Sequence, residues 1–325
     1  MEPRDIAALL ALMRVEGAGN ATGRRALSMA QFLGITVSEA IATDPRDLLL
    51  QLPANAFDAV LLAARQVNAD SLALAKRHAA RILHHGVRCS AFTDENYPEL
   101  LSLHLGETAP ALIWCAGNFD LLRAYSAGIV GTRTPSHTGE GIAADCARLF
   151  AREGICVVSG GADGIDTAAH RAALDANGST VIVLPQGIRR YSFPAYVRDA
   201  IESNQCVLIS QFDPEMAWQT HAAVTRNATI AALSKLVCVI EPRHMGGSMR
   251  TAAHTHEQSK PLFHYCESKR GAPYQSLTQY RASPLLSNGS SLDSHALLEA
   301  WRAAPGVKSQ QAEFDTCARD SLKAT

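Results

Sequence analysis

Six short apolar runs recur at regular intervals from residue 128 onward, and they constrain the fold more than any other feature of the chain. The runs occupy residues 128–131, 155–159, 180–184, 206–210, 236–241 and 261–264, and consecutive runs begin 20 to 30 residues apart. Strands that are apolar on both faces are typical of a parallel sheet covered by helices on both sides. Each interval is long enough for a crossover helix and two loops. The sequence therefore predicts an α/β fold with a Rossmann-like, doubly wound, mainly parallel sheet.

The regions on either side of this pattern differ from it. The N-terminal region carries apolar side chains at helical spacing, and helices are expected near residues 21–32, 38–42 and 56–80. Residues 94–118 are expected to add a hairpin or an extra strand before the sheet. The expected division is a small all-helical domain at 1–75, an extended Rossmann-like domain at 76–300 and a polar C-terminal tail at 301–325.

A glycine-containing turn at residues 15–20 admits two interpretations. Its sequence, VEGAGN, is similar to the hairpin of a helix-hairpin-helix module, in which glycine lets backbone N–H groups approach a phosphate. It also suits an ordinary turn between two helices. We favour the ordinary turn, because a short G-x-G is common.

The composition limits the classes of function. The 30 Lys and Arg residues nearly balance the 31 Asp and Glu residues, so any positive field that attracts nucleic acid must be local. No apolar run of about 18 residues occurs, so we expect no membrane span, and the N-terminus lacks the basic segment of a signal peptide. The eight scattered cysteines form no C-x-x-C pair, which favours the cytoplasm. We expect no metal at the HTHE run (254–257), whose histidines face different ways on a helix, and no cofactor.

The loops that follow the predicted strands carry the candidate chemistry, because ligands of an open α/β sheet bind beyond the carboxyl ends of its strands. These loops are rich in glycine, serine and threonine, and they place helix N-termini beside strand ends. They also contain Arg133, Arg189, Arg190, Arg226, Arg243 and Arg250. Helix N-termini bind anions, and arginine adds bidentate contacts to phosphate. Several such loops at one sheet edge predict a phosphate-binding pocket.

Some loop residues also have simpler explanations. Gly160, Gly161 and Gly164 are compatible with tight turns alone. We expect Asp166 to cap a helix or orient a neighbour rather than act in catalysis. His170, one turn later, is expected to pack or hydrogen-bond rather than serve as a base.

The same loops resemble those of the DprA/Smf family of DNA-processing proteins. The most specific match is SGGADGID-x-x-AH at residues 159–170. The motifs GIVGTR-x-x-S-x-x-G, RN-x-x-IAALS and GS-x-x-TA occur in the family's order at 128–139, 226–234 and 247–252. The likeness extends from about residue 94 to residue 298. On these motifs the chain is identified as a divergent member of that family.

The resemblance implies a helical N-terminal module of SAM or helix-hairpin-helix type, an extended Rossmann domain and a homodimer. It implies binding of single-stranded DNA without catalysis, in recombination or natural transformation, with RecA as a partner. The candidate DNA- and phosphate-binding residues are Gly131, Arg133, Ser136, Gly139, Ser159, Gly160, Gly161, Gly164, Arg189, Arg190, Arg226, Asn227, Gly247, Ser248 and Thr251, supported by Asp166 and His170. Tyr191 and Phe193 are the candidates for stacking on bases.

Several positions depart from the family pattern. The family's RNR reads RNA at 226–228, which removes one cation, and Gly246 replaces the first serine of its SGS. A divergent copy of this kind also suits a regulatory or antitoxin component of a bacterial defence system, with a toxin or effector protein as its partner.

Enzymes are the remaining alternatives. Nucleotide-cleaving phosphoribohydrolases share the glycine loops, but their PGG-x-GT-x-x-E loop has Ala253 here in place of the glutamate. A dinucleotide oxidoreductase needs G-x-G-x-x-G after the first strand, and GTRTPSHTG at 131–139 does not provide it. A nucleotide ligand stays open, because a phosphate pocket does not identify the molecule that carries the phosphate.

Overall fold

One mainly parallel sheet organises the structure, which is a computed structural model describing residues 1–49, 51–53, 57–268, 271–287, 289 and 291–304. The strands described are β1 (Arg88–Ala91), β2 (Leu112–Gly117), β3 (Ser126–Gly131), β4 (Cys156–Gly160), β5 (Thr180–Val183), β6 (Cys206–Ser210), β7 (Leu236–Ile240), β8 (Leu262–Tyr265) and β9 (Ser283–Pro284). They pair in the order β1-β2-β6-β5-β4-β3-β7-β8-β9. Every pairing from β6 to β9 is parallel, whereas β1–β2 and β2–β6 are antiparallel. The predicted fold class is confirmed.

All six apolar runs of the sequence form strands, β3 to β8, with ends that differ from the predicted ones by at most two residues. The extra strand expected within 94–118 is β2, which pairs with β1 and follows a short helix. Near the C-terminal end, β9 closes the sheet beside β8. A separate hairpin joins β10 (Leu286–Ser287) to β11 (Ser291–Leu292).

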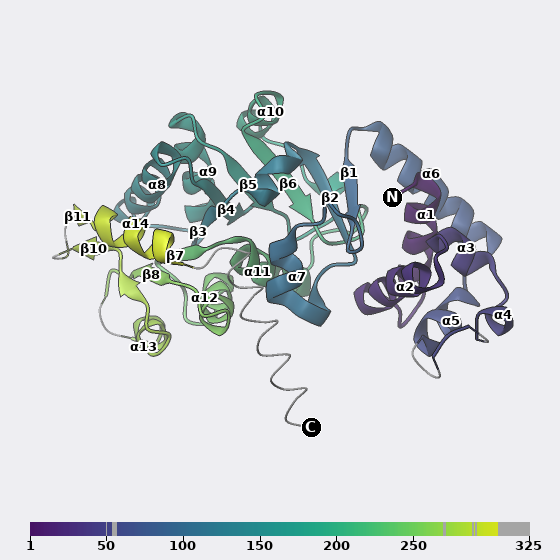
Figure 1. Ribbon diagram of the computed structural model, residues 1–325. Helices are drawn as coiled ribbons and strands as arrows, with labels where there is room; N and C mark the ends of the chain where they lie inside the picture. Colours follow the sequence, from purple (N-terminus) through teal and green to yellow (C-terminus); the bar gives the residue numbers. More distant parts are fainter. Residues whose placement is uncertain (50, 54–56, 269–270, 288, 290, 305–325) are drawn as a thin grey trace, which may run out of the picture.

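Helices cover both faces of the sheet. One face carries α8 (His137–Arg152), α9 (Ile165–Asp175), α10 (Ala195–Glu202) and α14 (Ser294–Ala303), and the other carries α7 (Glu99–Leu105), α11 (Thr220–Leu233), α12 (Gly247–Glu257) and α13 (Ala272–Gln279) (Figure 1). Short 3-10 turns lie at Gly106–Thr108, Phe119–Arg123 and Ile188–Arg190. Because successive side chains of a strand point to opposite faces, Ile129 packs with the α8 cluster and Val130 with the α11 and α12 cluster.

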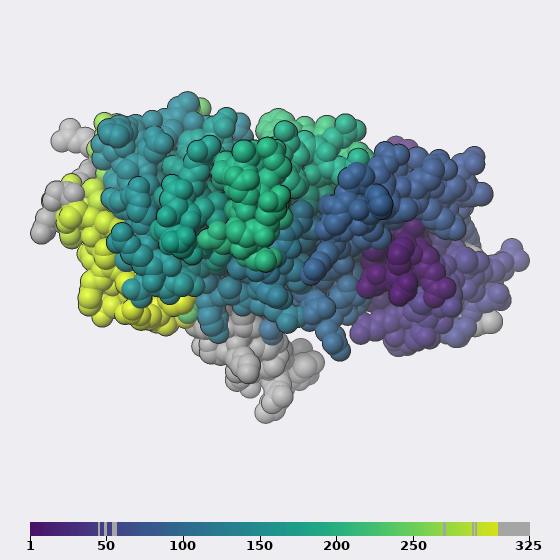
Figure 2. All heavy atoms as spheres, turned by 90° about the horizontal axis from the view of Figure 1, so that it is seen from above, coloured from purple at the N-terminus to yellow at the C-terminus, as the bar shows by residue number. Residues whose placement is uncertain are grey.

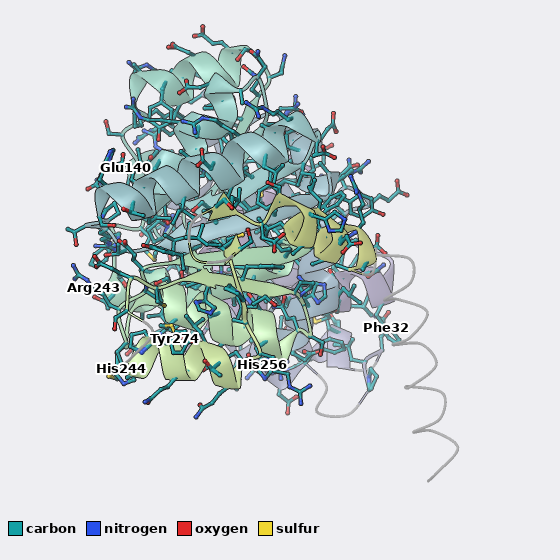
Figure 3. The ribbon with its side chains drawn as sticks, turned by 90° about the vertical axis from the view of Figure 1, so that its left-hand side faces the viewer. Phe32, Glu140, Arg243, His244, His256 and Tyr274 are labelled. Carbon is teal, nitrogen blue, oxygen red and sulfur yellow. The ribbon has the colours of Figure 1, made fainter. Side chains whose placement is uncertain are left out.

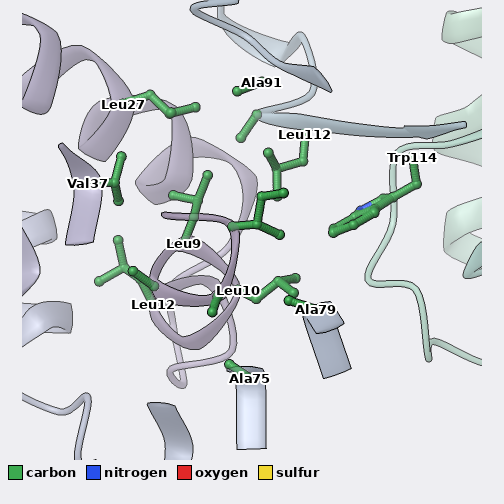
Figure 4. Close-up of a cluster of buried hydrophobic side chains, with 14 of the residues drawn as sticks. Leu9, Leu10, Leu12, Leu27, Val37, Ala75, Ala79, Ala91, Leu112 and Trp114 are labelled. Atoms are coloured by element: carbon green, nitrogen blue, oxygen red, sulfur yellow. The ribbon is translucent and has the colours of Figure 1, made fainter. Parts of the chain in front are cut away.

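The N-terminal region consists of helices packed around α1 (Pro3–Met13). They are α2 (Asn20–Leu33), α3 (Val37–Ala42), α4 (Pro45–Leu49), α5 (Asp58–Ala64) and α6 (Ala69–His84). Leu9 and Leu12 of α1 are fully buried, and they belong to the same cluster as Leu112 and Trp114 of β2 (Figure 4). The helical region therefore shares one hydrophobic cluster with the edge of the sheet.

The stretch predicted to be helical at 56–80 is interrupted rather than continuous. Asn68 accepts a hydrogen bond from the N–H of Ser71, and the Ser71 hydroxyl accepts one from the N–H of Asn68. This capping box starts α6 as a new helix. The predicted domain boundary between residues 75 and 76 falls within α6, so we propose that the helical region ends at His84.

The turn at 15–20 leads into a docking contact between the helices and the sheet domain. The amide of Asn20 donates to the carbonyl of Ala109 at 3.0 Å and accepts from the N–H of Ala111 at 2.6 Å. The guanidinium of Arg24 lies 3.8 Å from the ring centroid of Phe92. These contacts hold the N-terminal helices at one end of the molecule (Figure 2), and they agree with an ordinary interhelix turn.

The first residues of the region predicted to be a tail belong to α14. The indole of Trp301 donates to the carbonyl of Ser126 at 3.3 Å and lies edge-on to Tyr125. Residues 305–325 lie outside the described residues. None of the helices described is long and apolar enough to cross a membrane.

Candidate phosphate-binding site

The sheet topology creates a crevice between β3 and β7. The chain proceeds from β3 through β4 and β5 to β6 in one direction and then returns to place β7 on the other side of β3. The loops after β3 and β7 therefore diverge, which leaves room for a ligand at this switch point. A cleft of about 420 Å³ lies there. Its lining comes from those two loops, from the loop after β4 and the start of α9, from α11 and the segment before it, and from the first turn of α12.

Four guanidinium groups surround this cleft, which we call the arginine cleft. They belong to Arg133, Arg226, Arg243 and Arg250, and the carboxylate among the described lining residues is that of Asp166. Arg243 donates to the hydroxyl of Thr134 at 2.9 Å and lies at the margin of the molecule beside His244 (Figure 3). The chain as a whole is nearly neutral, so the arginine cleft supplies the local positive field that phosphate binding requires.

Arg226 is the most deeply placed of these cations. Its side chain is only 6% exposed, and its Nη1 donates to the carbonyl of Val183 at 3.1 Å. Its Nε has no hydrogen-bond partner among the described residues. Burial lowers the pKa of Arg226 and the neighbouring carboxylate of Asp166 raises it, but an arginine stays protonated in a protein. Arg226 is therefore a buried cation whose Nε–H has no acceptor among the described residues.

Asp166 compensates the charge of Arg226. Burial raises the pKa of Asp166, and the opposing influences, of which Arg226 is the strongest, favour its ionised form. The expectation that Asp166 caps a helix is wrong, because the N-cap of α9 is Gly164 and Asp166 lies within the first turn. The alternative expectation, that it orients a neighbour, agrees with its position beside Arg226.

His170 has a structural role in the site. Its Nε2 lies 2.7 Å from the carbonyl oxygen of Gly160, and its Nδ1 lies 2.6 Å from the hydroxyl of Thr180. Burial lowers the pKa of His170 to about 4. A carbonyl only accepts, so the neutral ring carries its proton on Nε2 and donates it to Gly160. The Thr180 hydroxyl beside Nδ1 donates to the carbonyl of Val157 at 2.8 Å. His170 therefore fixes the end of β4, as the packing interpretation expects.

The N-terminus of α8 is occupied by a carboxylate of the chain itself. The N–H of Ser136 donates to Oε2 of Glu241 at 2.8 Å, and its hydroxyl contacts Oε1 of the same carboxylate. A Cβ on Gly139 would lie 2.6 Å from the carboxylate carbon of Glu241. Ser136 also caps the helix by accepting from the N–H of Gly139 at 3.0 Å. In this structure Ser136 therefore bonds Glu241, and the absence of a side chain at Gly139 leaves room for that carboxylate.

The N-terminus of α12, in contrast, faces the arginine cleft. Its N-cap, Gly246, has no side chain to bond the first N–H groups, and Gly247, Ser248 and Thr251 line the cleft. The Nδ2 atom of Asn227 points to Gly247, since a Cβ there would lie 3.2 Å away. No hydrogen-bond acceptor in the described part of the chain reaches that Nδ2. This group of predicted residues is brought together as expected.

Other predicted residues shape the site without facing it. The hydroxyl of Ser159 is buried and donates to the carbonyl of Ile129. Gly164 has φ of +81°, and a Cβ there would lie 2.5 Å from the carbonyl oxygen of Thr132. Glycine is therefore required for the loops after β3 and β4 to meet. Gly131 lines the arginine cleft, whereas Gly161 lines a smaller hollow beside it.

The predicted cations at 189 and 190 do not line the arginine cleft. Arg189 forms an ion pair of 2.9 Å with Glu215, and Arg190 donates to the backbone carbonyl of Glu215 at 3.0 Å. Tyr191 lines the smaller hollow, which measures about 170 Å³. Phe193 packs 5.7 Å from Tyr191, measured between ring centroids, and lines neither of these two cavities.

Two apolar residues of the arginine cleft escaped the sequence analysis. Trp218 is 48% exposed and Met245 is 84% exposed, and both line the cleft. Trp218 lies in the segment between β6 and α11, and an aromatic residue in a loop at the binding edge of the sheet was the signal that would have found it. Met245 lies between Arg243 and Gly247, in a loop for which the sequence analysis considered only the glycines, serines and arginines.

Together the fold and the arginine cleft define an open α/β protein with an anion-binding site at its topological switch point. The family model for DNA recombination-mediator protein A matches residues 88–290. The chain belongs to this family, which confirms the resemblance found in its motifs.

Individual relatives carry the names DprA and Smf. The putative DNA processing protein DprA of Mycobacterium tuberculosis is 38% identical over 149 residues, which is 45% of this chain and 38% of that protein. The DNA processing protein DprA of Bacillus subtilis is 30% identical over 185 residues, which is 55% of this chain and 60% of that protein. The matches thus span less than two thirds of either relative.

Two solved structures share the fold. The X-ray structure of DprA from Streptococcus pneumoniae aligns with a TM-score of 0.65 at 22% identity and covers 88% of this chain and 95% of that chain. DNA processing protein A from Helicobacter pylori, whose structure describes a mode of binding single-stranded DNA, aligns with a TM-score of 0.54 at 22% identity. It covers 65% of this chain and 96% of that chain.

Proposed function

We propose that this protein binds single-stranded DNA, with phosphates held in the arginine cleft. The observation that carries the proposal is a pair of buried donors, Nε of Arg226 and Nδ2 of Asn227, that lack an acceptor among the described residues. Both residues line the same cleft. A buried donor without a partner costs about 1–3 kcal/mol. A phosphate oxygen in the cleft would satisfy both donors and would neutralise part of the charge of Arg226.

The arrangement of the other cations favours a strand over a single phosphate. Arg133, Arg243 and Arg250 are exposed at the mouth of the cleft, and the open N-terminus of α12 adds a further anion-binding position. Arg133 and Arg226 also line the smaller hollow beside the cleft. Successive phosphates of a strand would meet successive cations, as in other grooves that follow a nucleic-acid backbone. The family match and the Helicobacter pylori relative support this choice of ligand.

Titration of a labelled oligonucleotide by fluorescence anisotropy tests the proposal. Arg133→Ala and Arg226→Ala are each expected to raise Kd about tenfold or more, since each removes a charge-assisted phosphate contact. Arg148→Ala is the matched control, because Arg148 is exposed on α8 and pairs with Asp145 away from the cleft. Unchanged affinity in both cleft variants would show that the DNA binds elsewhere. Displacement of the strand by nucleoside monophosphate at similar concentration would favour a nucleotide ligand.

We extend the proposal to recombination in the cytoplasm, without catalysis. The homodimer and the RecA partner remain expectations from the resemblance, and light scattering and co-sedimentation with a RecA-class filament check them. The role in a defence or toxin system is less favoured, because the family match points to DNA processing. For the nucleotide-cleaving alternative, the test is release of free base from nucleoside monophosphates, abolished by Asp166→Ala.

A further inference from the structure

Trp218 stands where two hollows meet. The arginine cleft of about 420 Å³ and the smaller hollow of about 170 Å³ both include Trp218 in their lining. Arg133 and Arg226 also line both. The two hollows are therefore neighbours that share one aromatic ring and two cations. Gln186 and Tyr191 line the smaller hollow and not the arginine cleft.

The indole of Trp218 is not part of a hydrophobic core. It belongs to none of the apolar clusters formed by the described residues, and about half of its surface is exposed. The other two tryptophans do pack with apolar clusters. Trp114 is buried in the cluster shared by the N-terminal helices and the edge of the sheet, and Trp301 packs against the cluster that includes α8. A large apolar surface kept in water beside a cavity costs free energy that burial elsewhere would recover, so packing does not account for the position of Trp218.

The segment before Trp218 is braced from two directions. On one side, the N–H of Gly187 donates to the carbonyl of Met216 in this segment at 2.9 Å. A Cβ on Gly187 would overlap the carbonyl oxygens of Asp213 and Pro214, so glycine is needed for this approach. On the other side, Arg14 of the helical region donates to both carboxylate oxygens of Asp213, at 2.6 and 3.0 Å.

These bonds fix the backbone as far as Met216, two residues before Trp218. The ion pair of Arg189 with Glu215 adds a third tie to the same segment, which gives the predicted cation a positioning role in place of a phosphate contact. A ring held in place before binding loses less entropy when a ligand stacks on it. Nucleic-acid grooves combine cations that follow the backbone with aromatic rings on which bases stack. Trp218 and its two arginines provide both elements within one site.

We propose that Trp218 is a base-stacking platform, on which one base of the strand lies while Arg133 and Arg226 hold an adjacent phosphate. The strand then passes from the arginine cleft into the hollow lined by Tyr191. This inference rests on the proposed function and adds a base-reading subsite to it. Stacking accepts every base, so the subsite selects unpaired bases without selecting a sequence.

The test compares two ligands that differ only in their bases. One is a labelled oligo-dT strand, and the other is a strand of equal length made wholly of abasic deoxyribose phosphates. Trp218→Ala is expected to weaken binding of oligo-dT about tenfold, the loss typical of one base–aromatic stack. It is expected to leave binding of the abasic strand within twofold of the wild type, because the phosphate contacts remain. Trp218→Phe is expected to recover most of the affinity for oligo-dT.

Phe32→Ala is the control variant, since Phe32 is also an exposed aromatic residue but lies on α2 in the helical region, away from Arg243 (Figure 3). It is expected to bind both strands as the wild type does, and thermal unfolding verifies that each variant is folded. Equal affinity of Trp218→Ala and wild type for oligo-dT would overturn the inference while leaving the arginine variants to judge the proposed function. An equal loss on both strands would also overturn it, because the ring would then act on the backbone rather than on a base.

Discussion

The guanidinium group of Arg226 lies directly against the Cα of Gly160, and a Cβ built on Gly160 would overlap its Nη1 atom. The glycine at the end of β4 thus makes room for the buried cation of the arginine cleft. The same Cβ would lie 2.5 Å from Oδ2 of Asp166. Glycine is needed at position 160 because a side chain there would displace Arg226. A left-handed backbone is not the reason, since the φ of Gly160 is not positive.

Gly160→Ala is expected to displace Arg226 and to weaken binding of single-stranded DNA about tenfold or more, with a loss of stability of about 1–3 kcal/mol from overpacking. Anisotropy titration and urea unfolding measure the two effects. Gly141→Ala is the matched control, because Gly141 is an exposed residue of α8 with nothing within 4 Å of its Cβ position. That variant should bind normally and be as stable or slightly more stable. Normal binding by Gly160→Ala would contradict the placement of Arg226.

Asp166→Asn is expected to destabilise the fold by about 3 kcal/mol, because it leaves the charge of Arg226 buried without compensation. Urea unfolding at neutral pH measures this loss. The double variant Asp166→Asn with Arg226→Met should recover much of it, since both charges are then removed. If the single variant proved as stable as the wild type, the two side chains would not be coupled.

The stability of the protein is expected to fall as the pH drops from about 6.5 toward 4. The unfolded chain protonates His170 near pH 6.5 and the folded protein only near pH 4. The unfolded state therefore binds more protons in this window, and stability decreases with falling pH. Full protonation would cost the fold about 3 kcal/mol at this one residue.

The variant His170→Gln isolates this contribution. The variant keeps a donor for the carbonyl of Gly160 but does not titrate, whereas His78 and His264, whose pKa values are also lowered by burial, titrate in both proteins. Asp166, whose pKa is raised, opposes the trend at the acidic end. The difference in urea midpoint between pH 7 and pH 4.5 should be smaller in the variant. Equal differences would assign the pH dependence to other groups.

Ser136→Ala is expected to lower the stability of the protein without weakening its binding of single-stranded DNA. Loss of the cap should cost about 1 kcal/mol, whereas Kd for single-stranded DNA should stay within twofold, because Ser136 bonds Glu241 and not the ligand. Thermal unfolding and anisotropy titration on one preparation check both statements. A tenfold rise in Kd would restore Ser136 to the phosphate-binding set.

The sheet was predictable because its strands are buried on both faces and therefore read as continuous apolar runs. The start of α6 after Asn68 was harder to predict from the sequence. The capping box formed by Asn68 and Ser71 begins a new helix within a stretch whose apolar spacing continues without a break. The boundary expected at residue 75 lies inside α6, because no change of composition distinguishes the interior of that helix from its end.

The candidate site was predictable where a residue's role follows from its place in a loop. Arg133, Arg226, Gly247 and Ser248 meet at one cleft because parallel strands end at one edge. Charge alone did not distinguish Arg189 from these, since its partner Glu215 is distant in sequence. The position of Glu241 at the N-terminus of α8 could not be predicted either, because a sequence does not show which carboxylate reaches a helix N-terminus.

The salt dependence of binding tests the central claim most directly. Log Kd for oligo-dT, measured against the logarithm of salt concentration, should be linear, with a slope that reports the number of phosphates neutralised. Arg133→Ala should reduce the magnitude of the slope by about 0.7, the value for one phosphate contact on a single strand, and Arg148→Ala should leave it unchanged. A slope that is the same in all three proteins would contradict the claim that the arginine cleft holds the phosphates of the strand.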